Sequence, residues 1–173
     1  FYAAADVDVD ELAQLVDTVT PAGTYPHAAA ILSEVVVYDL AALADVRRDP
    51  VQRRELMAEI AHVLRDGPGV VVLKGAVERD VLDRATAAFE WMIAEQNQAG
   101  VNSGDHFAMV GTNDRVWNAL EKLAVAEPEC FVDYYESDAI ALAATSWLGP
   151  AYRITSQLNV VKPGGAAQSA HRD

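Results

Sequence analysis

His171, Arg172 and Asp173 form a His-x-Asp pattern, whose first and last side chains could bind one metal ion together. On an extended backbone, residues i and i+2 project from the same face, so an imidazole nitrogen and a carboxylate oxygen can approach the same ion. With a second histidine elsewhere, these residue types make the 2-His-1-carboxylate triad of non-haem iron(II) oxygenases, which leaves coordination positions open. The alternative interpretation is a histidine and an aspartate in a solvated loop, because so short a pattern is weak evidence alone.

The segment before this pattern is typical of a strand followed by a tight turn. Residues 152–162 are predicted to be extended, and Lys162-Pro163-Gly164-Gly165 supplies turn-forming residues. Side chains alternate between the two faces of a strand. Gln157 and Asn159 are therefore predicted on one face, and Leu158 and Val160 on the other.

The elements upstream are mostly helical. Apolar residues at helical spacing, bounded by capping residues or by proline and glycine, indicate a series of helices. Helices are predicted after Asp8 and Asp10, over residues 50–65 and 78–96, after Asn113 or Asp114, from Pro128, and from Ser137 or Asp138 to Leu148. Strands are predicted over residues 34–39 and, as a buried strand, over residues 70–73, because both runs are rich in valine.

The combination of these features resembles the phytanoyl-CoA dioxygenase family. The resemblance spans about residues 54–173, and includes the Gly69-Val-Val-Val-Leu strand, the long helix after it, the segment from Gln157 to Gly164, and the His-x-Asp pattern. It implies an α+β fold with a helical N-terminal support and the start of a double-stranded β-helix (a cupin-like jelly roll). Residues 1–173 are expected to be one domain whose barrel begins at about residue 150 and continues past residue 173.

The resemblance also implies the site. It assigns iron(II) binding to His171 and Asp173, and it makes Asn159 and Gln157 candidates for contacting 2-oxoglutarate or substrate. The alternative for Asn159 and Gln157 is that they are polar residues on a half-exposed strand. The family's distal histidine and its 2-oxoglutarate-binding arginine lie well downstream of His-x-Asp, so residues 1–173 alone are expected to be inactive.

The expected function is a non-haem iron(II) and 2-oxoglutarate-dependent dioxygenase, with dioxygen and a small organic molecule or acyl thioester as substrates. Asp173 favours hydroxylation, because halogenating relatives replace this carboxylate by a small residue. Two alternatives remain open at this point. The chain could be a non-catalytic helical interaction module with an accidental His-x-Asp, or a degenerate oxygenase fold used for binding.

The other polar candidates have plainer interpretations. His62 is predicted to be a helix residue and His27 a solvated loop residue, while His106, beside Asp105, belongs to a polar loop with a structural or substrate-covering role. Lys74 could steer an anionic co-substrate or be a surface lysine. The three tryptophans, which are predicted to pack in the core, are Trp91, Trp117 and Trp147.

The composition of the chain restricts the classes of partner that it could bind. The formal net charge of −13 argues against a nucleic-acid partner, because phosphate binding requires clustered lysine and arginine. No apolar run reaches the roughly 18 residues typical of a membrane span. The single cysteine, Cys130, is predicted to be a packed residue and fits a reducing compartment, so a cytoplasmic location is expected.

Overall fold

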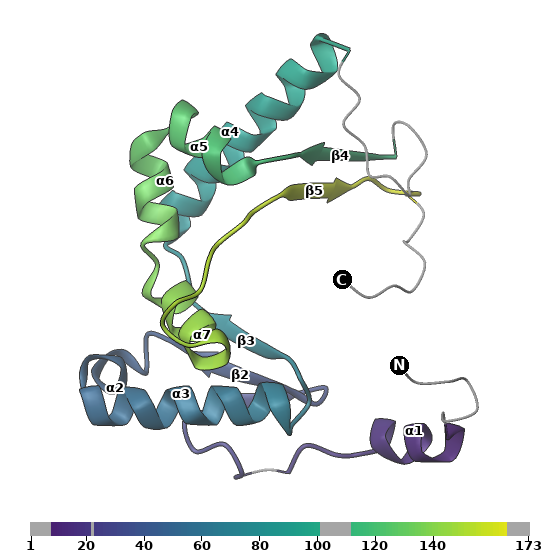
Figure 1. Cartoon of the computed structure of the whole chain (residues 1–173), viewed down its shortest axis with the longest axis vertical. Helices are drawn as coiled ribbons and strands as arrows, with labels where there is room; N and C mark the ends of the chain where they lie inside the picture. The colour runs from purple at the N-terminus through teal and green to yellow at the C-terminus, as the bar shows by residue number, and fades with distance from the viewer. Residues whose placement is uncertain (1–7, 22, 101–111, 166–173) are drawn as a thin grey trace. The chain divides into compact units, whose positions relative to one another are not determined.

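The computed structural model describes residues 8–21, 23–100 and 112–165, and the chain divides into two compact units, Phe1–Gly75 and Ala76–Asp173 (Figure 1). Within these described residues there are seven helices and two small sheets. The predicted α+β class is confirmed.

The first unit contains a three-stranded sheet with a crossover helix. Its strand order is β1-β2-β3, with β1 antiparallel to β2 and β2 parallel to β3. A parallel pair needs a long connection, which here contains α2 and α3. The elements of this unit are α1 (Val9–Val16), β1 (Ala30–Leu32), β2 (Val35–Asp39), α2 (Ala44–Arg48), α3 (Pro50–Arg65) and β3 (Val71–Lys74).

Helix α3 has the bounds that the sequence predicts. The Asp49 side chain accepts hydrogen bonds from the backbone N–H groups of Val51 and Gln52, each at 2.9 Å, and Pro50 occupies the first turn, where its missing N–H costs no helical bond. The apolar face consists of Leu56, Ile60 and Val63, each 0% exposed. Capping and apolar spacing therefore agree on the same helix.

Strand β3 confirms the predicted element but not its burial. Val70 and Val72 are each 44% exposed, while Val71 and Leu73 are half-buried. Alternate side chains leave a strand on opposite faces, so the two pairs lie in different surroundings. The run of valines indicated a strand correctly, but it was wrong as evidence that both faces are covered.

The second unit contains four helices and a two-stranded ribbon, and three of the helices pack with the ribbon around one core. Its elements are α4 (Arg79–Gln98), β4 (Asn113–Val116), α5 (Ala119–Ala126), α6 (Pro128–Tyr135), α7 (Asp138–Leu148) and β5 (Leu158–Val161). The core cluster draws on α4, β4, α5 and α6 and consists of Ala85, Ala88, Met92, Val116, Ala119, Leu123 and Cys130. The predicted starts of α6 at Pro128 and of α7 at Asp138 are confirmed.

The prediction of a helix capped by Asn113 or Asp114 was wrong. Residues Asn113–Val116 form strand β4, and helix α5 begins only after Asn118, which has left-handed backbone angles (φ 52°). Asparagine tolerates this conformation better than most residues. Pairing of β4 with β5, a partner more than 40 residues away in the chain (Asn113↔Val161), overrides the local helical spacing. Strand β5 is also shorter than the extended segment predicted over residues 152–162.

Two of the tryptophans were wrongly predicted to be core residues. Trp91 is 57% exposed and Trp147 is 54% exposed, whereas Trp117 is half-buried. Both exposed rings belong to helices of the second unit, α4 and α7, whose buried faces carry smaller side chains. No described helix is long and apolar enough to cross a membrane.

Cys130 is a packed core residue, as predicted. It is 1% exposed and its thiol contacts the carbonyl oxygen of Val81 at 3.9 Å; burial raises the pKa of the thiol. Because the thiolate is the reactive form, we expect native protein at mildly alkaline pH to react with iodoacetamide at least about tenfold more slowly than urea-unfolded protein. Equal alkylation rates in the native and unfolded protein, followed by mass spectrometry, would contradict this placement.

Candidate functional site

The predicted site residues fall into two groups. His171 and Asp173, the candidate iron ligands, lie outside the described residues, as do Asp105 and His106. Gln157 and Asn159, the candidate co-substrate contacts, lie in the described part of the second unit, just before and within β5. In the described part of the chain, no group of three or more His, Cys, Asp or Glu side chains could hold a metal ion.

The β4–β5 ribbon fixes which residues accompany Gln157 and Asn159. Arg115 is the register partner of Asn159, and Asn113 is the partner of Val161. Because alternate residues share a face, four polar side chains gather on one side of the ribbon. This polar face consists of Asn113, Arg115, Gln157 and Asn159.

Hydrogen bonds cross the polar face from strand to strand. The Arg115 guanidinium donates through Nη2 to Oε1 of Gln157, and Asn113 Nδ2 donates to Asn159 Oδ1 at 3.4 Å. The guanidinium also lies 4.0 Å from the ring centroid of Trp117, a cation–π geometry. The polar face is therefore an organised set of side chains in which one cation is held by an amide and by an aromatic ring.

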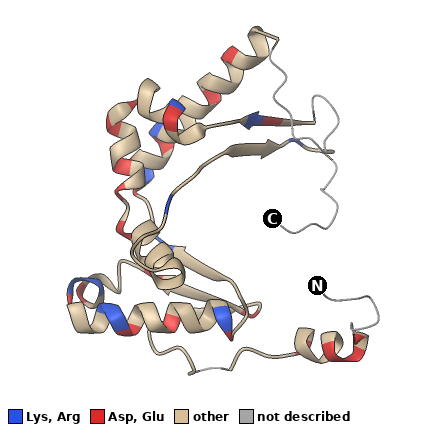
Figure 2. Ribbon diagram, viewed as in Figure 1, with Lys and Arg blue, Asp and Glu red and all other residues tan. Residues whose placement is uncertain are grey.

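The opposite face of the ribbon anchors it. Val116 is 0% exposed in the core cluster, and Leu158, its register partner, packs against the same cluster. On this face too, Lys162 Nζ lies 3.0 Å from Asp114 Oδ2, an ion pair that joins the two strands. In Figure 2 the two charged residues of β4, Asp114 and Arg115, give this strand neighbouring red and blue segments. Core packing on this face leaves Gln157 and Asn159, on the polar face, exposed to solvent.

Burial varies across the polar face. Asn113 is 6% exposed, Arg115 is half-buried, and Gln157 and Asn159 are exposed. A half-buried cation beside exposed amides can meet a ligand from solvent while remaining in a less polar setting than a surface arginine. Charge-assisted hydrogen bonds gain strength in such surroundings.

The sequence indicated only half of the polar face. Gln157 and Asn159 were placed on one face correctly, but Asn113 and Arg115 were missed, because residues 113–123 were predicted to be a helix. No local signal marked them. Residues 113–115 are three consecutive polar residues, and Val116 and Trp117 are two consecutive apolar ones, so the segment lacks the alternation of a strand.

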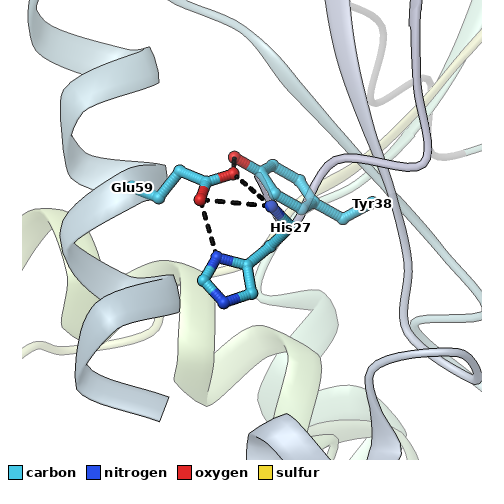
Figure 3. A network of polar contacts seen from close by, with 3 residues as sticks. All are labelled: His27, Tyr38 and Glu59. Atoms are coloured by element: carbon cyan, nitrogen blue, oxygen red, sulfur yellow. Dashed lines mark hydrogen bonds and ion pairs between the residues drawn. The ribbon is translucent and has the colours of Figure 1, made fainter. Parts of the chain in front are cut away.

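A second polar cluster lies in the first unit, where His27 was wrongly predicted to be solvated (Figure 3). His27 Nδ1 lies 2.6 Å from Oε2 of Glu59, and the Tyr38 hydroxyl donates to Glu59 Oε1 at 3.0 Å. The His27 backbone N–H also points at this carboxylate, 3.2 Å from Oε1. Burial, and then the nearby Glu59 charge, raises the pKa of Tyr38 far above its ordinary value. The cluster connects a loop, β2 and α3, which favours a structural role.

Lys74 and His62 are engaged in local contacts of the first unit. Lys74 Nζ lies 2.8 Å from Asp39 Oδ2, and this hydrogen bond raises the pKa of Lys74 and lowers that of Asp39. His62 is a helix residue, as predicted, and its Nδ1 lies 3.1 Å from Asp66 Oδ2. Both are ordinary polar contacts near a solvated surface, and the Lys74–Asp39 contact is an ion pair.

Comparison of the chain with protein-family models, with curated proteins and with solved structures found no match in any of the three. A function for the chain is therefore inferred from its own residues and their arrangement.

Proposed function

We propose that the chain belongs to a non-haem iron(II) and 2-oxoglutarate-dependent dioxygenase that resembles the phytanoyl-CoA dioxygenase family and hydroxylates a small organic molecule or acyl thioester. The observation that carries this proposal is the His171-x-Asp173 pattern a short distance along the sequence after β5, with two hydrogen-bonded amides, Gln157 just before this strand and Asn159 within it. The jelly-roll barrel and the downstream histidine and arginine belong to the same proposal.

The described ribbon supports the proposal in one specific respect. The resemblance expects a strand with polar residues on one face, then a turn and a short loop, then His-x-Asp, and β5 is a strand whose polar face carries Asn159. Pairing with β4 makes this face wider and more polar, because it adds Asn113 and Arg115. A non-catalytic helical module gives no reason for such a face in a sequence that also carries a His-x-Asp pattern.

Each proposed site residue has a distinct role. When bound, iron(II) and 2-oxoglutarate supply the oxidation of an unactivated C–H bond by dioxygen, with succinate and carbon dioxide as the other products. His171 provides an imidazole nitrogen and Asp173 a carboxylate oxygen to hold the metal. The amides of Gln157 and Asn159 can each donate and accept a hydrogen bond, so they can orient a carboxylate or carbonyl oxygen.

The direct test is an anaerobic titration of the full-length protein with iron(II) and 2-oxoglutarate. We expect the weak visible charge-transfer band of the metal–2-oxoglutarate chelate in the wild type and in His62→Ala, and no band in His171→Ala. His62 is the matched control because it is an exposed histidine on α3. A folded wild-type protein without the band, or a band that persists in His171→Ala, would refute the proposed function and favour a binding module.

A further inference from the structure

We infer that the polar face binds the carboxylate of a small organic anion, with Arg115 as the cationic contact. This inference rests on the proposed function, because it names a binding residue and a ligand chemistry for the same site. The resemblance assigns one carboxylate of 2-oxoglutarate to the downstream arginine. The ligand of Arg115 therefore has two possible sources, the other carboxylate of 2-oxoglutarate or a carboxylated substrate. Arg115 was assigned no role by the sequence.

The planar shape of the Arg115 guanidinium suits a carboxylate. A guanidinium is planar and presents paired N–H donors that match the two oxygens of a carboxylate. The contacts that orient the plane of Arg115 include the hydrogen bond to Gln157 and the ring of Trp117 at 4.0 Å. A side chain that is already ordered loses less conformational entropy when a ligand binds.

The charge pattern of the ribbon also favours an anionic ligand. The described residues of β4 and β5 carry one carboxylate, Asp114, and it projects from the opposite face, where it pairs with Lys162 at 3.0 Å. The polar face combines the Arg115 cation with three amides. In a chain of net charge −13, a strand face that joins one cation to several amide hydrogen-bond donors is suited to an anion.

The position of Arg115 in the ribbon also favours this role. Arg115 is directly opposite Asn159 in the register of the ribbon, and it donates to Gln157. These are the two residues that the resemblance makes contacts of 2-oxoglutarate or substrate. A carboxylate within reach of these amides is therefore also within reach of the guanidinium. An uncharged ligand would form no charge-assisted hydrogen bond between two opposite charges with this half-buried cation.

The test observes the side chains directly by NMR on the metal-free, full-length protein. The probes are 2-oxoglutarate, its neutral dimethyl ester, succinate and hexanoate, and the readouts are the Arg115 Nε–H and Trp117 indole N–H signals. We expect at least one carboxylate to shift both signals in a saturable way, and the dimethyl ester to shift neither. Arg115→Gln should weaken that binding by about 10- to 100-fold, the range for a charge-assisted hydrogen bond.

Matched variants separate binding from folding. Arg153→Gln removes the same charge from an exposed residue of the same unit and should leave the affinity unchanged. Arg115→Lys keeps the charge but loses the paired donors, so it should bind more weakly than the wild type. The signals of the wild-type protein decide the question even if Arg115→Gln does not fold.

The outcomes distinguish the ligand's source and the two proposals. Shifts with 2-oxoglutarate alone support the co-substrate as the ligand, and shifts with succinate or hexanoate support a carboxylated substrate. If no carboxylate moves the Arg115 signal, or the ester moves it equally, the anion site is refuted. Because no iron is present, this failure is distinct from the absence of the charge-transfer band, which would refute the oxygenase itself.

Discussion

Replacing Glu59 by alanine is expected to lower the free energy of unfolding of the first unit by about 2–4 kcal/mol. The Glu59 carboxylate accepts hydrogen bonds from the Tyr38 hydroxyl at 3.0 Å and from the His27 ring at 2.6 Å. Tyr38 is 0% exposed, so its hydroxyl would lose its acceptor where water cannot replace it. Urea denaturation followed by far-ultraviolet circular dichroism measures the change.

The control for this prediction is Glu55→Ala. Glu55 is an exposed glutamate one turn earlier on α3. Glu55→Ala therefore makes the same change in net charge and in helix-forming residue as Glu59→Ala, but it breaks no buried contact. It should change the stability by less than about 0.5 kcal/mol. Equal stability of the two variants would show that the cluster is not a stabilising one. Tyr38→Phe should cost less in the Glu59→Ala background than in the wild type, because the two residues share one interaction.

Replacing Leu123 by alanine is expected to destabilise the second unit by about 2–5 kcal/mol, the usual range for a leucine removed from a packed core. Leu123 is 0% exposed and belongs to the cluster that contains Val116 and Cys130. Truncation of this side chain leaves a cavity in the core against which the β4–β5 ribbon packs. Native-state hydrogen exchange should show faster exchange of the backbone amides of α4, α5 and the ribbon.

The matched control on the same helix is Val125→Ala. Val125 is 85% exposed, two residues along α5 from Leu123, so its truncation should leave the exchange rates of α4 and the ribbon unchanged. If Leu123→Ala also leaves them unchanged, the core cluster does not hold the ribbon in place. In that case the polar face would need another source of rigidity.

Local signals in the sequence were sufficient for some elements. The bounds of α3 follow from Asp49, Pro50 and the spacing of Leu56, Ile60 and Val63, all within one segment. The start of α6 follows in the same way from Pro128. These elements were predictable because capping and apolar periodicity act over a few residues and point to the same structure.

Long-range contacts account for what the sequence did not show. Asn113 is in a strand because of a partner near Val161, and His27 is half-buried because of a glutamate that is 32 residues away. Neither relation leaves a local pattern. The same holds for the candidate site: alternation was enough to place Gln157 and Asn159 on one face, but only the register with β4 brings Arg115 to them. The roles of His171 and Asp173 stay predictions.

The distribution of tryptophan has a practical consequence for studying the two units. Trp91, Trp117 and Trp147 all lie between Ala76 and Asp173, and the sequence has no tryptophan before Gly75. Intrinsic tryptophan emission is therefore an optical label of the second unit, whereas the first unit contributes only tyrosine and phenylalanine. Trp117 lies against Arg115, so its emission is sensitive to changes at the polar face. Trp91 and Trp147 are exposed on helices and report on those surfaces.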